Sequence, residues 1–336
     1  MRRSRTTLDE GRPKEVGPGP DGGEGRSRTA GARVALFGEA LWDLSPGGRR
    51  PGGAPLNVAT HLRAFGLDPL LVTRVGSDGP GRSLVREMRR RGLRTEGVQV
   101  DRRRSTGEAV VRDGPDGPSF EIPRGRAFDA IRTGEALRAV GAHRPAALYF
   151  GTLAQRAAAS RRALAALLAG TTCPRFVDLN LRPPDVDPPV VRASLRAADV
   201  LKASSAEVVA AVRLLRSRGT PHALPMAQRL FARIHASLLL VTRGAEGAIA
   251  CSLAGGWLAV ADVPRRPLPG RLVDTVGAGD AFSAAALAGW LAGWPIPTLV
   301  RRAAAFARAV CTIPGAVPDD PAFHEPFRRS WRLAPP

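Results

Sequence analysis

The stretch RLVDTVGAGDAFSAAALAGWL, residues 271–291, contains small residues that lead through an aspartate into a run of helix-forming residues. It predicts a helix whose first turn is built by Gly277, Ala278 and Gly279, with Asp280 beside them. The first turn of a helix carries unpaired backbone N–H groups and the positive end of the helix dipole. Because bulky side chains are absent there, these N–H groups predict an anion hole for a phosphate or a developing oxyanion.

Asp280 is unusual beside a phosphate site, because a carboxylate repels phosphate. The same carboxylate is well placed to take a proton from an alcohol that attacks the phosphate. Taken alone, the pattern also fits an ordinary helix start with a favourable acidic residue in its first turn. The chain has no GxxxxGK[ST] motif, which excludes a Walker-type phosphate loop.

Outward from this motif, short apolar strands alternate with helical stretches from Arg33 onward. The predicted strands are RVALFGEAL, PLLVTRVG, PAALYFG, RFVDLNL, ADVLKAS and SLLLVTRG, and the helices include APLNVATHLRAFG, PGRSLVREMRRRGL and residues 156–169 and 205–216. Alternation over this length predicts an α/β fold in which a mostly parallel sheet is covered by helices on both faces.

Two stretches interrupt the alternation. Residues 41–51 form a short extended piece, and residues 97–124 hold several short strands around the turn signal DGPDG, with no helix between them. They predict a small β-lid outside the main sheet, able to cover a site at the carboxyl ends of its strands. An exposed lid has free edges, which could pair with a second subunit to form a homodimer.

The two ends of the chain are predicted to be tails. Residues 1–32 are rich in Gly, Pro, Arg and acidic residues without periodicity, which predicts disorder. An alternative is that this segment is not translated and that initiation occurs downstream, with Val16 as one candidate start. Residues 33–325 are predicted to form the folded domain, and residues 326–336 a C-terminal tail.

The net charge of +20, from 50 basic and 30 acidic residues, would suit a nucleic-acid-binding protein. However, only Lys14 and Lys202 are lysines, the arginines are mostly scattered, and aromatic residues make up 5% of the chain. Few aromatic side chains are therefore available to stack on bases. We interpret the charge as solvated surface shaped by GC-rich codon usage, without a specific nucleic-acid partner.

The sequence also predicts a cytoplasmic protein without a membrane partner. No apolar run reaches the ~18 residues of a membrane span, and the amino terminus lacks the apolar segment of a secretory signal. The three cysteines, Cys173, Cys251 and Cys311, lie far apart and form no CxxC pair. They are expected to be reduced core residues.

Two further glycine-containing stretches each allow two interpretations. VTRGAEGA ends a predicted strand and offers Thr242, Gly244 and Gly247 to a ligand, or forms an ordinary β-hairpin turn. RPGGAPLNVATHL places two glycines before a helix that carries Asn57 on an otherwise apolar face. That asparagine is either exposed or holds a polar ligand.

PGGAPLNVATHLRAFG, RVGSDGPGRSL and DTVGAGDAF resemble the signature regions of the ribokinase-like (PfkB-type) carbohydrate kinases, in the same order. FGEALWDL, GTLAQR and DLNLRPP resemble the fructokinase branch in particular. The resemblance runs from about Val34 to Pro318. It implies a three-layer α/β/α sandwich with a β-lid and ATP-dependent phosphorylation of a sugar hydroxyl. Fructose is the leading acceptor, and 2-keto-3-deoxygluconate and a riboside are alternatives.

The resemblance also implies roles for individual residues. Asp280 matches the catalytic base, and Gly277, Ala278 and Gly279 match the anion hole. Positions that bind the sugar, or lie near it and the triphosphate, are matched by Asp43, Gly53, Asn57, Asn180 and Arg182. Arg124 falls where related sugar-acid kinases place a substrate-capping arginine. The loop along the nucleotide is matched by Thr242, Gly244, Glu246 and Gly247. Asp274 and Thr275 fall where many relatives bind a monovalent cation such as potassium.

One segment departs from the family pattern. The family usually reads Lys-x-Asn-x-x-Glu where Asn and Glu organise magnesium and phosphate, whereas this chain reads KASSAE. Ser204 replaces the Asn at this ATP-binding position, and Glu207 is retained to contact Mg²⁺ through water. Serine can accept a hydrogen bond from a metal-bound water, but its reach is shorter. A catalytically weak paralogue that binds sugar or nucleotide is therefore an alternative. Lys202 either fills a role that a guanidinium cannot or is there by chance.

Overall fold

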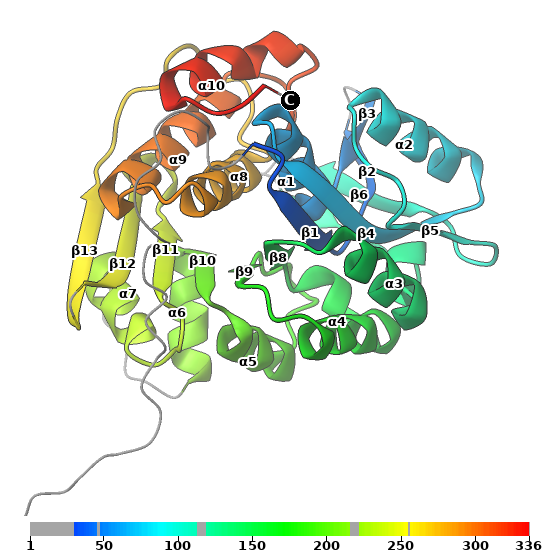
Figure 1. The fold of residues 1–336 in the computed structure, drawn as a ribbon, viewed down its shortest axis with the longest axis horizontal. Coiled ribbons are helices and arrows are strands. Elements are labelled where there is room, and N and C mark those ends of the chain that lie inside the picture. Colours follow the sequence, from blue (N-terminus) through cyan, green and yellow to red (C-terminus); the bar gives the residue numbers. More distant parts are fainter. Residues whose placement is uncertain (1–29, 46–47, 113–118, 216–221, 255, 336) are drawn as a thin grey trace, which may run out of the picture.

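The computed structural model describes residues 30–45, 48–112, 119–215, 222–254 and 256–335. Its centre is a nine-stranded sheet in the order β13-β12-β11-β10-β9-β8-β1-β4-β5 (Figure 1). The strands are β1 Arg33–Phe37, β4 Asp68–Gly76, β5 Val98–Asp101, β8 Ala147–Phe150, β9 Arg175–Asp178, β10 Val200–Ser204, β11 Leu238–Thr242, β12 Ala248–Ala254 and β13 Trp257–Val263. The strands from β11 to β5 run parallel to their neighbours, while β12 and β13 pair antiparallel. The predicted mostly parallel sheet is confirmed.

Helices cover both faces of this sheet because successive strand residues point to opposite sides. In β1, Val34 and Leu36 belong to one core cluster, and Ala35 and Phe37 belong to the other. The first cluster is covered by α1 Ala54–Ala64, α2 Gly79–Arg90, α8 Ala278–Leu291, α9 Ile296–Val310 and α10 Glu325–Trp331. The second is covered by α3 Thr133–His143, α4 Ala158–Gly170, α5 Pro188–Ala197, α6 Ser205–Leu214 and α7 Ala223–Phe231 (Figure 1).

The lid is a separate four-stranded sheet in the order β3-β2-β6-β7. Its strands are β2 Leu41–Ser45, β3 Gly48–Gly52, β6 Gly107–Arg112 and β7 Ser119–Glu121. The predicted lid range 97–124 begins too early, because β5 pairs in parallel with β4 in the central sheet. A buried ion pair between Arg74 of β4 and Asp101 of β5, 3.2 Å apart, joins the same two strands.

The two predicted tails differ in outcome. Apart from its last three residues, the predicted disordered tail 1–32 lies outside the described residues. The prediction of a C-terminal tail over residues 326–336 is wrong, because helix α10 covers residues 325–331 and its Trp331 is buried. The ring centroids of Trp331 and Phe65 are 5.4 Å apart, a distance typical of packed aromatic pairs. The folded domain therefore extends past residue 325.

Helix α8, which starts at the small-residue motif, is buried over most of its length. Its residues from Asp280 to Gly289 are all buried, and it packs between α1 and α9. A Cβ on Gly289 would lie 2.2 Å from Trp294 Cε3, so this position needs glycine for the following turn to close. A helix that is apolar around its whole circumference is held by its neighbours on all sides. Its first turn is thus fixed at the carboxyl edge of the sheet.

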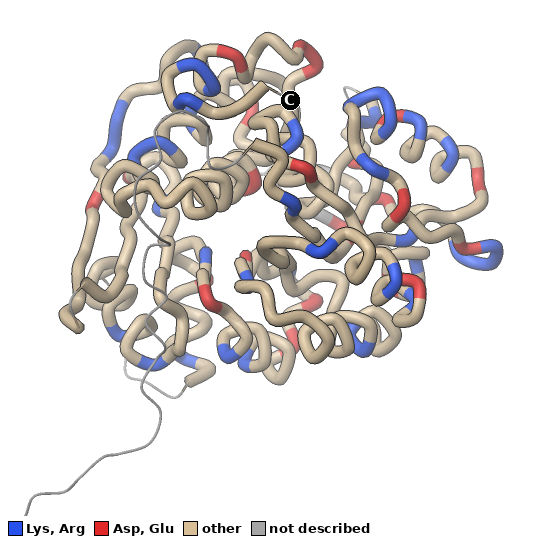
Figure 2. Tube along the Cα trace, in the orientation of Figure 1, with Lys and Arg blue, Asp and Glu red and all other residues tan. Residues whose placement is uncertain are grey.

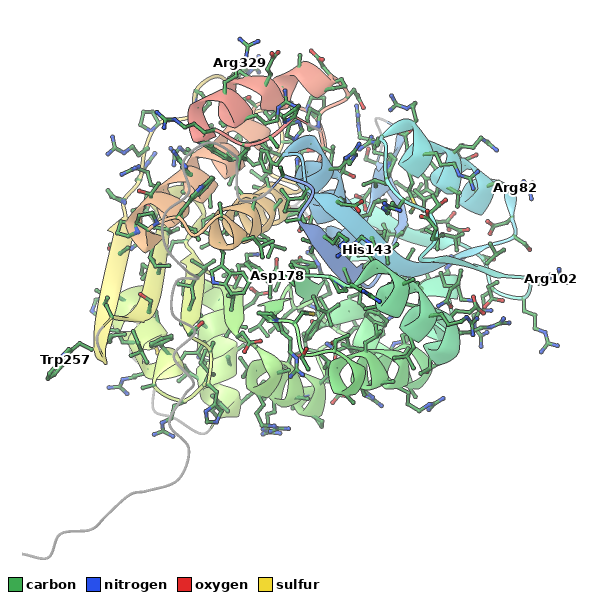
Figure 3. All side chains as sticks on the ribbon, viewed as in Figure 1. Arg82, Arg102, His143, Asp178, Trp257 and Arg329 are labelled. Carbon is green, nitrogen blue, oxygen red and sulfur yellow. The ribbon has the colours of Figure 1, made fainter. Side chains whose placement is uncertain are left out.

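Basic residues are spread around the periphery and alternate with acidic ones (Figure 2). The side chains of Arg82, Arg102 and Arg329 project outward, away from the sheet (Figure 3). This distribution fits the interpretation of the net charge as solvated surface. Cys173, Cys251 and Cys311 are free thiols, but only Cys251 is buried in the core, and the other two are half-buried. Among the described helices, none has the length and apolar character that a membrane span requires.

Candidate active site

A small cleft, with a cavity volume of about 40 Å³, opens at the carboxyl edge of the sheet, between the lid and the start of α8. Its lining includes six of the predicted site residues, which are Asp43, Gly53, Asn57, Arg182, Gly277 and Asp280. They come from the lid, α1, the loop after β9 and the first turn of α8. Segments far apart in the sequence therefore meet where ligands bind in open α/β sheets.

The first turn of α8 has the open backbone that the sequence predicts. Gly277 is the N-cap, with a φ of 76° that favours glycine. A Cβ on Gly277 would lie 2.4 Å from Ala316 Cα, so the space behind the turn is filled. A Cβ on Gly279 would lie 3.2 Å from Lys202 Nζ. The ammonium group of Lys202 therefore lies close to the first turn of α8, where the sequence predicts an anion hole.

Asp280 is buried and faces the cleft. The Asn57 side-chain amide donates a hydrogen bond of 2.8 Å to its Oδ2 atom. Asn57 is therefore buried rather than exposed, and it holds the carboxylate. Burial raises the pKa of Asp280, and Asp178 raises it further, whereas the Asn57 hydrogen bond and the charges of Lys202 and Arg182 lower it. A carboxylate with a raised pKa is a stronger base for accepting a proton from an alcohol.

A buried ion pair, which the sequence analysis did not predict, lies next to the first turn of α8. Lys202 Nζ lies 3.0 and 3.2 Å from the two oxygens of Asp178, which is fully buried in the interior (Figure 3). Ser283 Oγ donates a 2.8 Å hydrogen bond to the same carboxylate. Because Ser283 lies on α8 three residues after Asp280, this cluster joins the first turn of α8 to β9 and β10. Lys202 therefore has a specific structural role.

Glu39 is the charged residue of the described cleft lining that the sequence interpretation missed. It lies two residues after the end of β1, and an acidic residue just after a buried strand was the available signal. Burial raises the pKa of Glu39 to about 7, and the nearby charge of Asp280 contributes, although Arg182 lowers it. Burial also raises the pKa of Asp43 to about 7, again with Asp280 raising it and Arg182 lowering it. Three carboxyl groups thus share the cleft with one arginine.

Replacement of Glu39 by Gln is expected to stabilise the protein without ligand above pH 7 and to leave stability unchanged below pH 4.5. The pKa of Glu39 rises from 4.5 to about 7 on folding, so the folded state holds a proton that the unfolded state has lost. The stability that this group contributes is present below pH 4.5 and is lost as the pH rises through 7. Urea unfolding of both proteins across this range measures the difference. A difference independent of pH would contradict the raised pKa.

Ser204 and Glu207 form a capping box at the start of α6. Ser204 Oγ accepts a hydrogen bond of 3.3 Å from Glu207 N, and Glu207 Oε2 accepts one of 2.6 Å from Ser204 N. Glu207 Oε1 accepts a third, of 2.6 Å, from Leu181 N in the loop after β9. The spacing S-x-x-E was the signal for this cap in the sequence. Each carboxylate oxygen has a second lone pair, so Glu207 can still accept a hydrogen bond from a metal-bound water.

Thr242 ends β11, and Gly244, Glu246 and Gly247 lie in the turn between β11 and β12. The two strands pair antiparallel with Thr242 opposite Ala248, so the hairpin interpretation is correct in structural terms. A hydrogen bond of 2.9 Å from Arg243 N to Gly247 O closes the turn. A Cβ on Gly247 would lie 2.0 Å from Val263 O. The hairpin follows the carboxyl end of β11, at the same sheet edge as the start of α8.

The remaining predicted residues lie outside the cleft lining. Arg124 is exposed and pairs with Asp185. Asn180 follows β9 with a φ of 41°.

Both oxygens of Asp274 accept backbone hydrogen bonds of 2.9 Å, from Val276 N and Gly315 N, and Thr275 O accepts one of 3.3 Å from Ala278 N. In the described part of the chain, no cluster of three His, Cys, Asp or Glu side chains could hold a metal ion.

Comparison with known proteins connects this geometry to a family. Residues 33–322 match the model of the pfkB family of carbohydrate kinases. A fructokinase of Klebsiella pneumoniae is 32% identical over 280 residues, covering 79% of this chain and 86% of the relative.

Two solved structures have the same fold. An uncharacterised sugar kinase of Pyrococcus horikoshii in complex with ATP superposes with a TM-score of 0.72 at 25% identity, covering 84% of this chain and 93% of that chain. A fructokinase variant of Vibrio cholerae in a form with bound fructose, ADP and potassium ion has a TM-score of 0.70 at 21% identity, covering 88% and 98%.

Proposed function

The chain belongs to the pfkB family of carbohydrate kinases, and from this premise we propose that it transfers the γ-phosphate of ATP to a hydroxyl group of fructose. The observation that carries the proposal is the juxtaposition of Asp280 with the glycine-lined start of α8. A base and an anion hole meet there at the end of a polar cleft. This is the arrangement that phosphoryl transfer to an alcohol requires.

In this proposal, Asp280 accepts the proton of the sugar hydroxyl as that oxygen attacks the phosphate. Asn57 orients the carboxylate through its 2.8 Å hydrogen bond. The N–H groups of the first turn of α8 stabilise the charge on the transferred phosphoryl group. The Lys202 ammonium group adds positive charge next to this turn, and its ion pair with Asp178 fixes its position.

The nucleotide is proposed to lie along the hairpin at residues 242–247 and the start of α6, with Ser204 and Glu207 nearest to its metal ion. Magnesium would supply charge neutralisation of the phosphates. Glu207 would contact the ion through water, because both carboxylate oxygens already accept backbone hydrogen bonds. Asp274 and Thr275 are proposed to lie beside a potassium site.

A neutral sugar fits the charges of the cleft better than a sugar acid. Glu39, Asp43 and Asp280 can each accept hydrogen bonds from sugar hydroxyls, but as carboxylates they repel an acidic substrate. Arg124, the residue expected to cap a sugar acid, is paired with Asp185. The similarity to the Klebsiella fructokinase supports the same choice. We therefore place fructose ahead of 2-keto-3-deoxygluconate and a riboside.

A coupled ADP-release screen tests this choice. Purified protein is assayed with neutral ketoses, aldoses, ribosides and sugar acids, with and without potassium. Fructose is expected to give the highest kcat/KM, and potassium is expected to increase the rate. If 2-keto-3-deoxygluconate or a riboside gives a higher kcat/KM than fructose, the substrate proposal is wrong while the kinase family stands.

Replacement of Ser204 by Asn is expected to lower the magnesium concentration needed for half-maximal ADP binding, with little change in sugar affinity. Asparagine reaches further than serine and is an equally good N-cap, so α6 keeps its start. Titration calorimetry of ADP at several magnesium concentrations measures the effect. The Ser204→Ala control lacks the cap and should lose about 0.5–2 kcal/mol of stability. An unchanged magnesium dependence in Ser204→Asn would show that Ser204 does not limit metal use.

We propose that the protein is cytoplasmic and that it forms a homodimer. A cytoplasmic location is supported by three free thiols, which suit a reducing compartment. A homodimer through the lid is supported by its edge strands β3 and β7, which are unpaired on their outer sides in the described sheet. Light scattering on the purified protein would decide between monomer and dimer.

A further inference from the structure

Two buried histidines form a hydrogen-bonded pair behind the anion hole. His61 lies on α1, and His324 lies just before α10, 263 residues away in the sequence. His61 Nδ1 and His324 Nε2 are 2.9 Å apart, and His61 Nε2 is 3.0 Å from the carbonyl oxygen of Ala316. The exposed fractions of the two side chains are 0% and 3%. Nothing in the proposed phosphoryl transfer uses this pair directly.

The geometry determines the direction of each hydrogen bond. A carbonyl oxygen only accepts, so His61 Nε2 carries the hydrogen and donates it to Ala316. In the neutral ring Nδ1 must then accept, and His324 Nε2 donates to it. His324 Nδ1 has no hydrogen-bond partner among the described residues. Burial lowers the pKa of both rings, with His324 and Arg91 lowering that of His61 and Arg328 lowering that of His324. Both rings are therefore neutral at neutral pH.

The backbone that His61 holds is the one that supports Gly277. A Cβ on Gly277 would lie 2.3 Å from Ala316 Cβ and 3.0 Å from Ala316 O, so the two backbones are in direct contact. The preceding residue, Gly315, donates a 2.9 Å hydrogen bond to Asp274 Oδ2. The turn at residues 315–316 is thus held by Asp274 from one side and by His61 from the other. Any shift of this turn would move the N-cap of α8.

We propose that His61 is a positioning residue for the anion hole, acting through Ala316 on Gly277, with His324 fixing its ring. The proposal rests on the proposed function, because the anion hole is taken to bind the transferred phosphate. Helix α1 would then position both halves of the site. Asn57 holds the base, and His61, one helical turn later, holds the turn that backs the anion hole.

Kinetics of two substitutions test the proposal. His61→Leu removes the N–H donor and is expected to lower kcat/KM for ATP about tenfold or more, since small displacements of positioning groups cost up to about 10²-fold. The KM for the sugar is expected to stay within about twofold, because the turn at residues 315–316 does not line the cleft. His61→Gln keeps an N–H donor near the position of Nε2 and should recover most of the activity.

His143→Leu is the matched control. His143 is also buried, and its Nε2 lies 3.1 Å from the carbonyl oxygen of Asp68, on α3 and away from the cleft. This variant should lose stability but keep the wild-type kinetic constants for ATP. Equal kinetic losses in His61→Leu and His143→Leu, or no recovery in His61→Gln, would show that His61 is only structural and would overturn the proposal.

Hydrogen exchange gives a readout that does not depend on activity. The amide of Ala281 donates to Gly277 O at 2.8 Å, and that of Gly315 donates to Asp274. Both amides are expected to exchange faster in His61→Leu than in wild type, with no change in His143→Leu. Unchanged exchange in His61→Leu would overturn the positioning role. If the wild-type protein phosphorylates no sugar but this difference in exchange is seen, the proposed function fails and the positioning role stands.

Discussion

Asp280→Asn is expected to lower kcat with fructose by about 10²- to 10⁴-fold, the usual contribution of a general base. Asparagine keeps the size of the side chain but cannot accept the proton of the sugar hydroxyl. The affinity for ATP should hold or increase slightly, because a buried negative charge beside the γ-phosphate is removed. Steady-state kinetics with direct measurement of ATP binding would separate the two effects.

A control for burying an amide in place of a carboxylate is Asp101→Asn. Asp101 is as deeply buried as Asp280, but it pairs with Arg74 in β4 and β5, outside the cleft. This variant should lose stability and keep kcat. If Asp280→Asn retained more than about a tenth of wild-type turnover, Asp280 would not be the base, and transfer would rest on positioning and electrostatics.

Gly277→Ala is expected to lower kcat/KM for ATP by about 10²-fold, comparable to the loss of an oxyanion-hole donor. The added Cβ would lie 2.3 Å from Ala316 Cβ and 2.4 Å from Ala316 Cα, and the φ of 76° disfavours any side chain. The first turn of α8 must therefore shift, and its N–H groups lose their common target. Unlike Asp280→Asn, this change should weaken ATP binding as well as turnover.

Gly256→Ala is the control for backbone strain alone. Its φ of 81° also disfavours a side chain, but a Cβ there meets nothing within 4 Å. It should show unchanged kinetics for ATP.

Gly279→Val should also hinder the close approach of phosphate, because its Cβ would lie 3.2 Å from Lys202 Nζ. If Gly277→Ala bound ATP as tightly as the wild-type protein does, the assignment of the first turn of α8 as the anion hole would be wrong.

The features that local sequence determines were predictable. The glycine-lined start of α8 follows from residues adjacent in the chain, and so does the alternation of apolar strands with helices that predicts the parallel sheet. The spacing S-x-x-E is a local signal for the capping box of Ser204 and Glu207. The sequence analysis did not use this signal, because it compared the segment only with the family pattern, in which Asn stands in place of Ser204. The same segment therefore supports both a structural and a metal-related role.

Features that depend on distant segments were not predictable in this way. One example is the pairing of β5 with β4, and another is the packing of Trp331 against Phe65. No sequence pattern near any of these residues indicates its partner. Likewise, nothing near His61 in the sequence indicates that His324 lies 2.9 Å away. The burial that raises the pKa of Glu39 likewise depends on how distant segments pack. Such contacts are determined by the tertiary structure.

The central claim is that this cleft transfers phosphate from ATP to a sugar, with Asp280 as the base. It is tested most directly by incubating the purified protein with ATP, magnesium and fructose and following the products by ³¹P NMR. We expect one fructose phosphate for each ADP formed by the wild-type protein, and almost none by Asp280→Asn. ADP formation without any sugar phosphate, or equal yields from the two proteins, would contradict it.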